Sequence, residues 1–446
     1  MMPKTLRLVL LSIRDLLVSA GPVVLLVIGL LVLAYWWLDP QPPRRVVLAS
    51  GATGSAYDNF ARRYAEALKT DGIAVVEKRS DGSLDDLELL RRGEADVAFV
   101  RGGSADPVAD EAAGLVSLGA LFYEPLWIFV RKDRLAPGKP PIALAQLKGM
   151  RVNVDKPGSG VPQLVDQLLQ ANHFAEGAVT LSHLEPAPAA EALKGGMLDA
   201  MVLASAPQSK VVQQLLRRSD IALMDVQQAE VYVRRFGFLS AVTLPRGVVD
   251  LAADLPPRDV TLLAATTSLL AREQTHPALR QLFAQNAQSI HSAGGWFNRA
   301  RDFPNTRTSE LPVSVEGDRA INGTPPFWQR YLPFWASNLF ERMWLVIGGL
   351  LVMMLPLSRV VPPLYQFRVR SRVFRWYARL RDIEQRGEPG GADLPEHQQE
   401  LLDELDLLEQ HVNKVTVPLS YSGELYELRA HIRAARQRLQ LRLPPP

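Results

Sequence analysis

The chain of 446 residues has no cysteine and almost no net charge. Without cysteine there is no disulfide scaffold, thiol nucleophile, iron–sulfur cluster or cysteine-bound zinc, although large extracytoplasmic domains also fold without disulfides. Fifty Lys and Arg residues against 47 Asp and Glu leave a charge of only +3. This balance argues against nucleic-acid binding, which needs a dense basic face. A hydrophobic content of 47% argues against wholesale disorder, and the length allows about three domains.

Motifs of common enzymes are also missing. The sequence has no Gly-x-Ser-x-Gly, and its seven histidines include no His-Glu-x-x-His pair. His173 and His183 have no evident nucleophile as a partner. The segment Gly51–Gly54 is neither a P-loop nor a Gly-x-Gly-x-x-Gly fingerprint. We therefore expect no enzymatic activity, no cofactor and no metal, and an enzyme remains only a third hypothesis.

Two apolar segments predict membrane attachment. Leu16–Leu38 has 23 uncharged residues, enough to span a bilayer, and ends in Tyr35-Trp36-Trp37 where a signal peptide would have small residues. Leu339–Leu357 follows a group of aromatic residues but is shorter, so a buried core helix is the alternative. Basic residues precede the first segment and follow the second. The positive-inside rule then predicts two spans, cytoplasmic termini and residues 39–338 outside.

The region between the two spans alternates strand-like and helix-like segments up to about residue 300, which favours βαβ units and mainly parallel sheets. Its length suits two lobes. Phe238–Leu244 is predicted to be a strand returning to the first lobe, and Val260–Glu273 and Pro277–Ala293 are predicted to be helices. After the second span, apolar residues at helical spacing predict a small helical bundle or coiled coil. They are Val373, Trp376, Tyr377, Leu380, Ile383, Leu402, Leu405, Leu408, Val412, Leu425, Leu428, Ile432 and Leu439.

Three turns rich in Gly and Ser each follow an extended segment and open a helix. A helix start has unpaired N–H groups and a partial positive charge, and glycine lets a ligand approach the backbone. Ordinary helix capping explains any one of them, whereas three on two lobes favour a site for an anion or carboxylate. Asp85 and Asp86 in the second turn could hold an amine or only satisfy the helix dipole. The candidate residues in the turns are Gly51, Thr53, Gly54, Ser55, Tyr57, Gly82, Ser83, Asp86, Gly158, Ser159 and Gly160.

Three further candidates lie near strand ends. Arg101 ends a buried strand, where it could clamp a carboxylate through two parallel hydrogen bonds or be a surface residue. Tyr123, with Glu124, precedes a strand and Ser205 follows one, so both could line the same cleft. Tyr57 could stack over a ligand or belong to the core.

These turns also carry a family resemblance. Over residues 46–290 the sequence resembles the TAXI family of TRAP-transporter solute-binding proteins. The resemblance implies a two-lobed, type-II periplasmic-binding-protein fold that closes on a small solute, often a carboxylate such as glutamate or 2-oxoglutarate. Three residues depart from the family pattern: Asp86 replaces the usual Asn, Arg101 stands where Gln is common, and Val161 replaces a usual Thr. Because of these departures, the resemblance does not identify the ligand. The matching segments, in family order, are Gly51–Tyr57, Gly82–Leu87, Gly93–Val100, Leu147–Val152, Pro157–Gly160 and Asp199-Ala200.

The predicted organisation has an anchor at 1–38, a first lobe at 39–130 and 235–300, and a second lobe at 131–234. A stalk at 301–338, a second transmembrane helix at 339–357 and a cytoplasmic helical tail at 358–446 complete it. The predicted function is a receptor, tethered to a bacterial inner membrane with its main domain in the periplasm, that binds a small organic anion, a carboxylate or amino acid, for a TRAP-type transport system. Its partners would be TRAP permease subunits and membrane lipid, with no nucleic acid. The alternative is a sensor or scaffold with a degenerate cleft that signals through a cytoplasmic protein bound to the tail.

Overall fold

The structure is a computed structural model that describes residues 4–39, 41–136, 138–324, 327–387, 395–415, 417 and 421–441. Residues 1–3 of the predicted anchor, 325–326 of the predicted stalk, and 388–394, 416, 418–420 and 442–446 of the predicted tail lie outside them. The chain divides into two compact units, residues 40–340 and residues 1–39 with 341–446. Each unit is described by itself.

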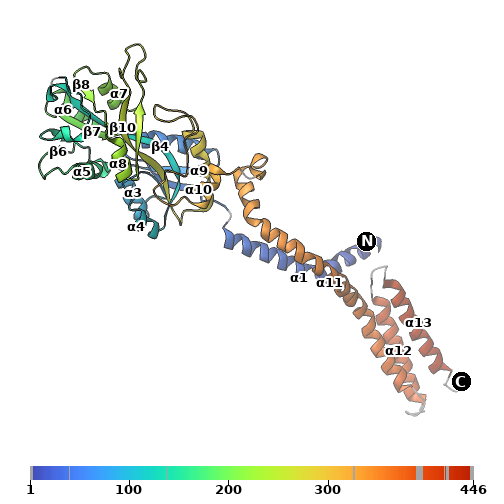
Figure 1. Cartoon of the computed structure of the whole chain (residues 1–446). Coiled ribbons are helices and arrows are strands. Elements are labelled where there is room, and N and C mark those ends of the chain that lie inside the picture. Colours follow the sequence, from blue (N-terminus) through green and yellow to red (C-terminus); the bar gives the residue numbers. More distant parts are fainter. Residues whose placement is uncertain are drawn as a thin grey trace. The chain divides into compact units, whose positions relative to one another are not determined.

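The unit of residues 40–340 has two lobes that share two long strands, β4 (Leu115–Arg131) and β10 (Val260–Arg272) (Figure 1). The sheet of the first lobe has the order β2-β1-β3-β10-β4, and that of the second has β4-β7-β5-β6, with β8 on β4 and β9 on β10. The first lobe contains β1 Arg45–Ala49, α2 Ala56–Lys69, β2 Ala74–Lys78, α3 Ser83–Arg91, β3 Val97–Arg101, α4 Pro107–Ala112, α9 Pro277–His291 and α10 Val315–Asn322. The second contains β5 Arg151–Asn153, α5 Val161–Ala171, β6 Thr180–Ser182, α6 Pro186–Lys194, β7 Ala200–Ala204, α7 Lys210–Leu216, β8 Ile221–Leu223, α8 Ala229–Arg235 and β9 Leu239–Leu244. Short 3-10 helices are η1 Lys132–Arg134, η2 Leu144–Leu147, η3 Pro157–Ser159 and η4 Phe327–Arg330.

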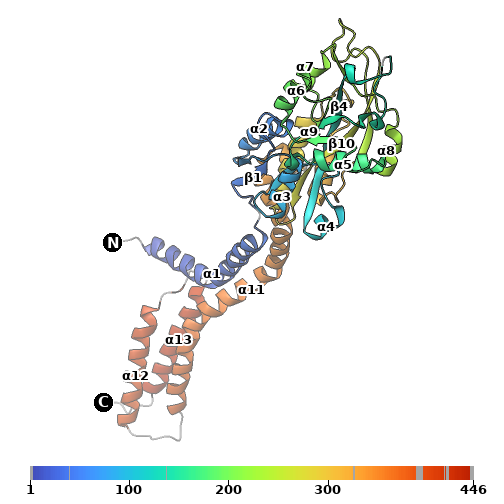
Figure 2. The ribbon, with the colours of Figure 1, turned by 90° about the vertical axis from the view of Figure 1, so that its left-hand side faces the viewer.

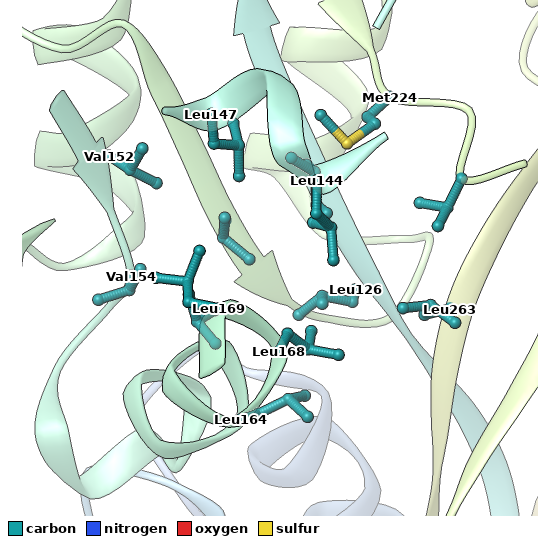
Figure 3. Close-up of a cluster of buried hydrophobic side chains, with 14 of the residues drawn as sticks. Leu126, Leu144, Leu147, Val152, Val154, Leu164, Leu168, Leu169, Met224 and Leu263 are labelled. Carbon is teal, nitrogen blue, oxygen red and sulfur yellow. The ribbon is translucent and has the colours of Figure 1, made fainter. Parts of the chain in front are cut away.

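Each lobe buries both faces of its sheet. Along β4, Leu126, Ile128 and Val130 pack in one core of the second lobe, while Trp127 and Phe129 pack in the other. Successive strand side chains point to opposite faces, so one strand supplies both cores. Figure 3 shows the first of these cores, in which leucines of α5 lie against side chains of β4 and β10. The first lobe repeats this arrangement, with α2 and α9 on one face and α3 on the other.

The predicted two-lobed α/β fold of the type-II periplasmic-binding-protein class, with apolar helices on either side and a helical tail, is confirmed. Two details differ. The segment Val260–Glu273 was expected to be helical, but β10 occupies it. The run is buried on both faces and pairs with β3 and β4, and this tertiary pairing outweighs the helix propensity of its Leu and Ala residues. The sheets are also mixed: β1 pairs with β2 and β3 in parallel, but β4 and β10 are antiparallel to each other and to the other strands with which they pair, β3, β7, β8 and β9.

Segment boundaries also depart from the sequence prediction. Leu239 and Val242, which the prediction assigns to the first lobe, pack in the two cores of the second. Part of the predicted stalk is packed rather than extended, since Phe303 and Leu311 are buried and Val313 forms a bridge to Ser117 of β4. These apolar side chains cover the first lobe, which is why the Pro- and Gly-rich passage before the second apolar helix has fixed structure.

The other unit contains the apolar helices and the tail: α1 Lys4–Leu38, α11 Phe334–Arg386, α12 Pro395–Lys414 and α13 Ser422–Gln440. Two stretches, Gly21–Leu38 and Phe334–Pro356, are long and apolar enough to cross a membrane, and almost none of their residues is buried. The end of α11 packs with α12 and α13 (Figure 2) around the apolar residues that the sequence predicts for the bundle.

The tail bundle permits a simple stability test. Leu405 of α12 is fully buried and Leu407 of the same helix is 55% exposed. We expect Leu405→Ala to destabilise the bundle by about 2–5 kcal/mol, the cost of a large-to-small change in a core. Leu407→Ala should change it by less than about 0.5 kcal/mol. Urea unfolding of residues 358–446, in which Trp376 is the one tryptophan, measures both changes by fluorescence, and equal effects would contradict the bundle.

Candidate functional site

The three Gly- and Ser-containing turns come together in the structure. The first lies between β1 and α2, the second opens α3, and the third contains η3 and opens α5. The first and second are joined because the Gly51 N–H donates to Asp86 Oδ1 over 3.3 Å. The second and third touch directly: a Cβ on Gly82 would lie 2.8 Å from Ser159 Cα, and one on Gly158 would lie 2.7 Å from Asp81 Cβ. The turns therefore form one site at the junction of the two lobes.

Charges also join the lobes at this junction. Lys156 of the second lobe reaches Asp81 of the first, with Nζ 2.6 Å from Oδ1, and lies 3.0 Å from Glu185 of its own lobe. These two carboxylates raise the pKa of Lys156 to about 12. This ion pair and the close approach of Gly82 to Ser159 join the two lobes at the turns.

Two main-chain amides of the first turn are already engaged by carboxylates of the chain. Gly51 N–H donates to Asp86, Gly54 N–H donates to Asp58 Oδ2 over 2.8 Å, and Ser55 Oγ accepts from the Asp58 N–H as the helix N-cap. Thr53 is exposed in this turn. Carboxylates of the chain itself thus occupy the positions that an anion was expected to take.

The second and third turns are similarly bonded. Ser83 Oγ accepts from the Arg101 N–H and donates to Ser104 Oγ, and Ser159 Oγ accepts from the Val161 N–H. Gly160, at φ +73°, leaves space for Arg101, because a Cβ there would lie 2.9 Å from Arg101 Nη2. In these turns the glycines allow the backbones of the two lobes to pack closely, because a side chain at these positions would collide with the other lobe.

Asp86 is fully buried and shapes the first two turns. Its Oδ1 accepts from Ser80 Oγ over 2.6 Å as well as from Gly51, and its Oδ2 has no partner in the described part of the chain. Burial raises the pKa of Asp86 to about 8, although both hydrogen bonds oppose the shift. A neutral carboxyl below that pH fits a site without a cation close by.

This raised pKa makes a prediction about stability. The folded protein holds the Asp86 proton more tightly than the unfolded chain, where the group titrates near 3.8. Its stabilising effect is therefore complete below about pH 4 and is lost as the pH rises towards about 8. We expect Asp86→Asn to remove this slope and to gain at least about 1.4 kcal/mol over the wild type at pH 8, the free energy of one pKa unit. Thermal unfolding from pH 5 to about pH 9 tests it, and parallel curves for the two proteins would contradict it.

A group of polar side chains lies behind the turns, at the junction of the shared strands. We call it the interlobe cluster and define it as Tyr57, Arg101, Glu124, Asp155 and Thr267. Glu124 Oε2 accepts from the Tyr57 hydroxyl over 2.8 Å and from Thr267 Oγ1 over 3.0 Å. All five side chains are buried although four can carry charge, which is costly unless each finds a partner.

Arg101 is the least satisfied member of the interlobe cluster. It is 2% exposed, its Nε has no hydrogen-bond partner, and none of the ion pairs among the described residues includes it. Its positive charge still affects the pKa values of two neighbouring residues. Burial and Glu124 raise the pKa of Tyr57, and burial raises that of Asp155, while Arg101 opposes both shifts. A buried guanidinium with an unused donor is suited to bind a carboxylate.

Other sequence-predicted residues lie elsewhere or play another role. Tyr57 has two roles: its hydroxyl belongs to the interlobe cluster, while its ring packs in the core, stacked on Phe99 with ring centroids 5.5 Å apart. Tyr123 packs edge-on against Phe303 and lines a separate cavity of about 180 Å³ with Phe122, Gln208 and Trp296. Ser205 uses its carbonyl oxygen to accept from Trp127 Nε1, and no described contact brings it to the interlobe cluster.

Sequence reasoning missed part of the site. Asp155 and Thr267 were not candidates, and Glu124 was noted only beside Tyr123. A usable signal was the run Thr266-Thr267-Ser268 in an otherwise apolar segment, since polar residues in a buried strand need partners. Assigning that segment to a helix hid the signal.

The overall structure has distant similarity to solved proteins. A protein of Bordetella bronchiseptica RB50 is 18% identical, with 68% of this chain and 82% of that chain covered and a TM-score of 0.40. The periplasmic aliphatic sulphonate binding protein SsuA of Escherichia coli is 16% identical, covering 68% and 79%, with a TM-score of 0.36. The CcmR regulatory domain of Synechocystis PCC6803, solved with 2-PG, is 17% identical, covering 56% and 98%, with a TM-score of 0.38. At scores this low, none of them informs the site.

The family assignment is firmer. Residues 48–300 match the NMT1-like family, and this range includes all three turns and the whole interlobe cluster. The match extends over more than half of the chain, from within β1 to beyond the end of α9. The chain belongs to the NMT1-like family.

Proposed function

We propose that this protein is a membrane-attached receptor that binds a small organic anion, a carboxylate or an amino acid, between its two lobes. The observation that carries the proposal is the buried Arg101 guanidinium with its unpartnered Nε. An isolated buried charge is strongly unfavourable, and an anion that accepts two parallel hydrogen bonds would compensate it. The backbone amides of the first turn, which the sequence favoured, contribute less because Asp58 and Asp86 occupy them.

The neighbours of Arg101 define what the anion would meet. Gly160 comes from the second lobe, Ser104 comes from the first lobe, and Thr267 lies opposite Arg101 on the shared strand β10. Glu124 and Asp155 are the acidic members of the interlobe cluster and would face an amino group if the ligand carries one. Closing the lobes would exclude water and so strengthen these contacts.

Membrane attachment is the second part of the proposal. Gly21–Leu38 and Phe334–Pro356 would span an inner membrane, with the lobes in the periplasm and both termini in the cytoplasm. Bound solute would be handed to permease subunits of a TRAP-type system. Two spans are too few for a permease, so the transport path would belong to such partners.

A second candidate function has its own observation. The second and third turns touch each other, and Asp58 and Asp86 accept hydrogen bonds from the Gly54 and Gly51 amides of the first turn. Both features would be expected in a cleft that no longer accepts a solute. In that case lobe packing would be structural, and the bundle of α11, α12 and α13 would act by binding a cytoplasmic protein.

Thermal shift of the full chain in detergent, with a panel of carboxylates and amino acids, separates the two. A ligand at 100 times its Kd should stabilise the folded state by about 2.7 kcal/mol. A stabilising solute supports the receptor. No shift with any solute, together with a specific protein bound to residues 358–446, supports the alternative.

A further inference from the structure

A second cavity lies in the first lobe, away from the interlobe cluster. Its volume is about 280 Å³, and it lies between α9, α10 and the segment of η4. Its lining is almost wholly polar: Gln281, Gln285, Gln288, Arg319, Ala320, Gly323, Thr324 and Gln329. Drug-sized ligands usually occupy about 300–1,000 Å³, so this cavity suits a smaller chemical group.

The cavity offers hydrogen-bond donors and positive charge. Gln285 Nε2 donates to Gln329 Oε1 over 2.9 Å, which leaves the Gln329 Nε2 group as the free end of that amide. This Nε2 is buried and has no partner in the described part of the chain. Arg319 is exposed, and no ion pair among the described residues involves it. None of the described lining residues is acidic, so an anion with several acceptor oxygens is the complementary ligand.

The sequence places this cavity beside the expected membrane surface. Gln329 belongs to η4, and the apolar stretch begins at Phe334. The same segment exposes Phe327, Trp328, Tyr331 and Trp335 to solvent. Exposed aromatic rings next to an apolar helix are typical of the headgroup level of a bilayer. A donor group held among them would meet lipid phosphates before any other abundant anion.

We infer that the cavity binds the phosphate of a membrane lipid headgroup, with Arg319 and the Gln329 Nε2 group as donors. The inference rests on the membrane attachment proposed above. Binding there would hold the first lobe at the bilayer surface at a second point besides the helix itself. The lipid phosphate supplies acceptor oxygens to a buried donor that otherwise has none.

Native mass spectrometry of the full chain in detergent, titrated with phosphatidylglycerol, tests this. Arg319→Ala and Gln329→Glu should each weaken lipid retention about tenfold, equivalent to about 1.4 kcal/mol. Gln329→Glu keeps an acceptor for Gln285 but replaces the donor with a negative charge. Arg307→Ala is the matched control, because Arg307 is an exposed arginine of the same passage that does not line the cavity. It should retain lipid as the wild type does.

Two further arms separate the outcomes. Inorganic phosphate at the same concentration as the lipid should not displace it; equal competition would overturn the assignment to lipid. Flotation with phosphatidylglycerol liposomes checks membrane attachment itself, and failure of the wild type to float would overturn both proposals. If the wild type floats and both variants retain lipid as the wild type does, only the present inference is wrong.

Discussion

Replacing Arg101 with alanine is expected to weaken binding of the organic anion by about 30-fold or more. Arg101 is 2% exposed and its Nε has no partner among the described residues, so its hydrogen bonds to a ligand would form in a nearly dry site. Removing one partner of a buried, hydrogen-bonded charge pair costs about 2–5 kcal/mol, which sets that scale. Isothermal titration calorimetry with the solute found by thermal shift measures the change.

Two variants sharpen the Arg101 test. Arg101→Lys keeps the charge but loses the planar pair of donors, so its affinity should fall between those of the wild type and Arg101→Ala. Arg234→Ala removes an equal charge from the exposed surface of α8 and should bind as the wild type does. Without ligand, Arg101→Ala should have a free energy of unfolding close to that of the wild type, because the substitution removes a buried charge that has no ion-pair partner among the described residues. Unchanged affinity in Arg101→Ala would remove the basis of the proposed site.

Gly82→Ala is expected to prevent full closure of the lobes and to weaken ligand binding by roughly 5- to 150-fold. The added Cβ would lie 2.8 Å from Ser159 Cα, a contact that exists only when the second and third turns meet. Overpacking of this kind costs about 1–3 kcal/mol, and here it would fall on the closed form alone. The open form would keep its free energy apart from the backbone strain at φ +142°.

A matched glycine separates strain from steric conflict. Gly54 has φ +78°, and a Cβ there would meet nothing within 4 Å. Gly54→Ala should therefore cost only the left-handed backbone term, about 1–2 kcal/mol, in both forms. Because the chain lacks cysteine, spin labels at Lys69→Cys and Lys148→Cys report one distance between the lobes. A ligand-bound distance in Gly82→Ala equal to that of the wild type would contradict the closure mechanism.

Much of the local structure followed from the sequence because it depends on neighbouring residues. The helix α2 begins where Ser55 caps it, and it buries Tyr57, Ala61, Tyr64 and Leu68, which the spacing of an α-helix puts on one face. The apolar residues of the tail form one core for the same reason. The turns, the apolar helices and the two-lobed fold class were readable in this way.

The tertiary structure decided which groups satisfy each other, because those pairings join residues far apart in the chain. Asp86 accepts a hydrogen bond from the Gly51 N–H. Glu124 on β4 accepts from the hydroxyls of Tyr57 and of Thr267 on β10. No local pattern fixes such bonds, since each depends on how two shared strands bring the lobes together. The strand at Val260–Arg272 was unreadable because burial on both faces removes alternation. The sequence by itself thus determined where the turns and the short strands β1, β3 and β7 lie. Only the packing of the lobes buried the Arg101 Nε group without a hydrogen-bond partner among the described residues.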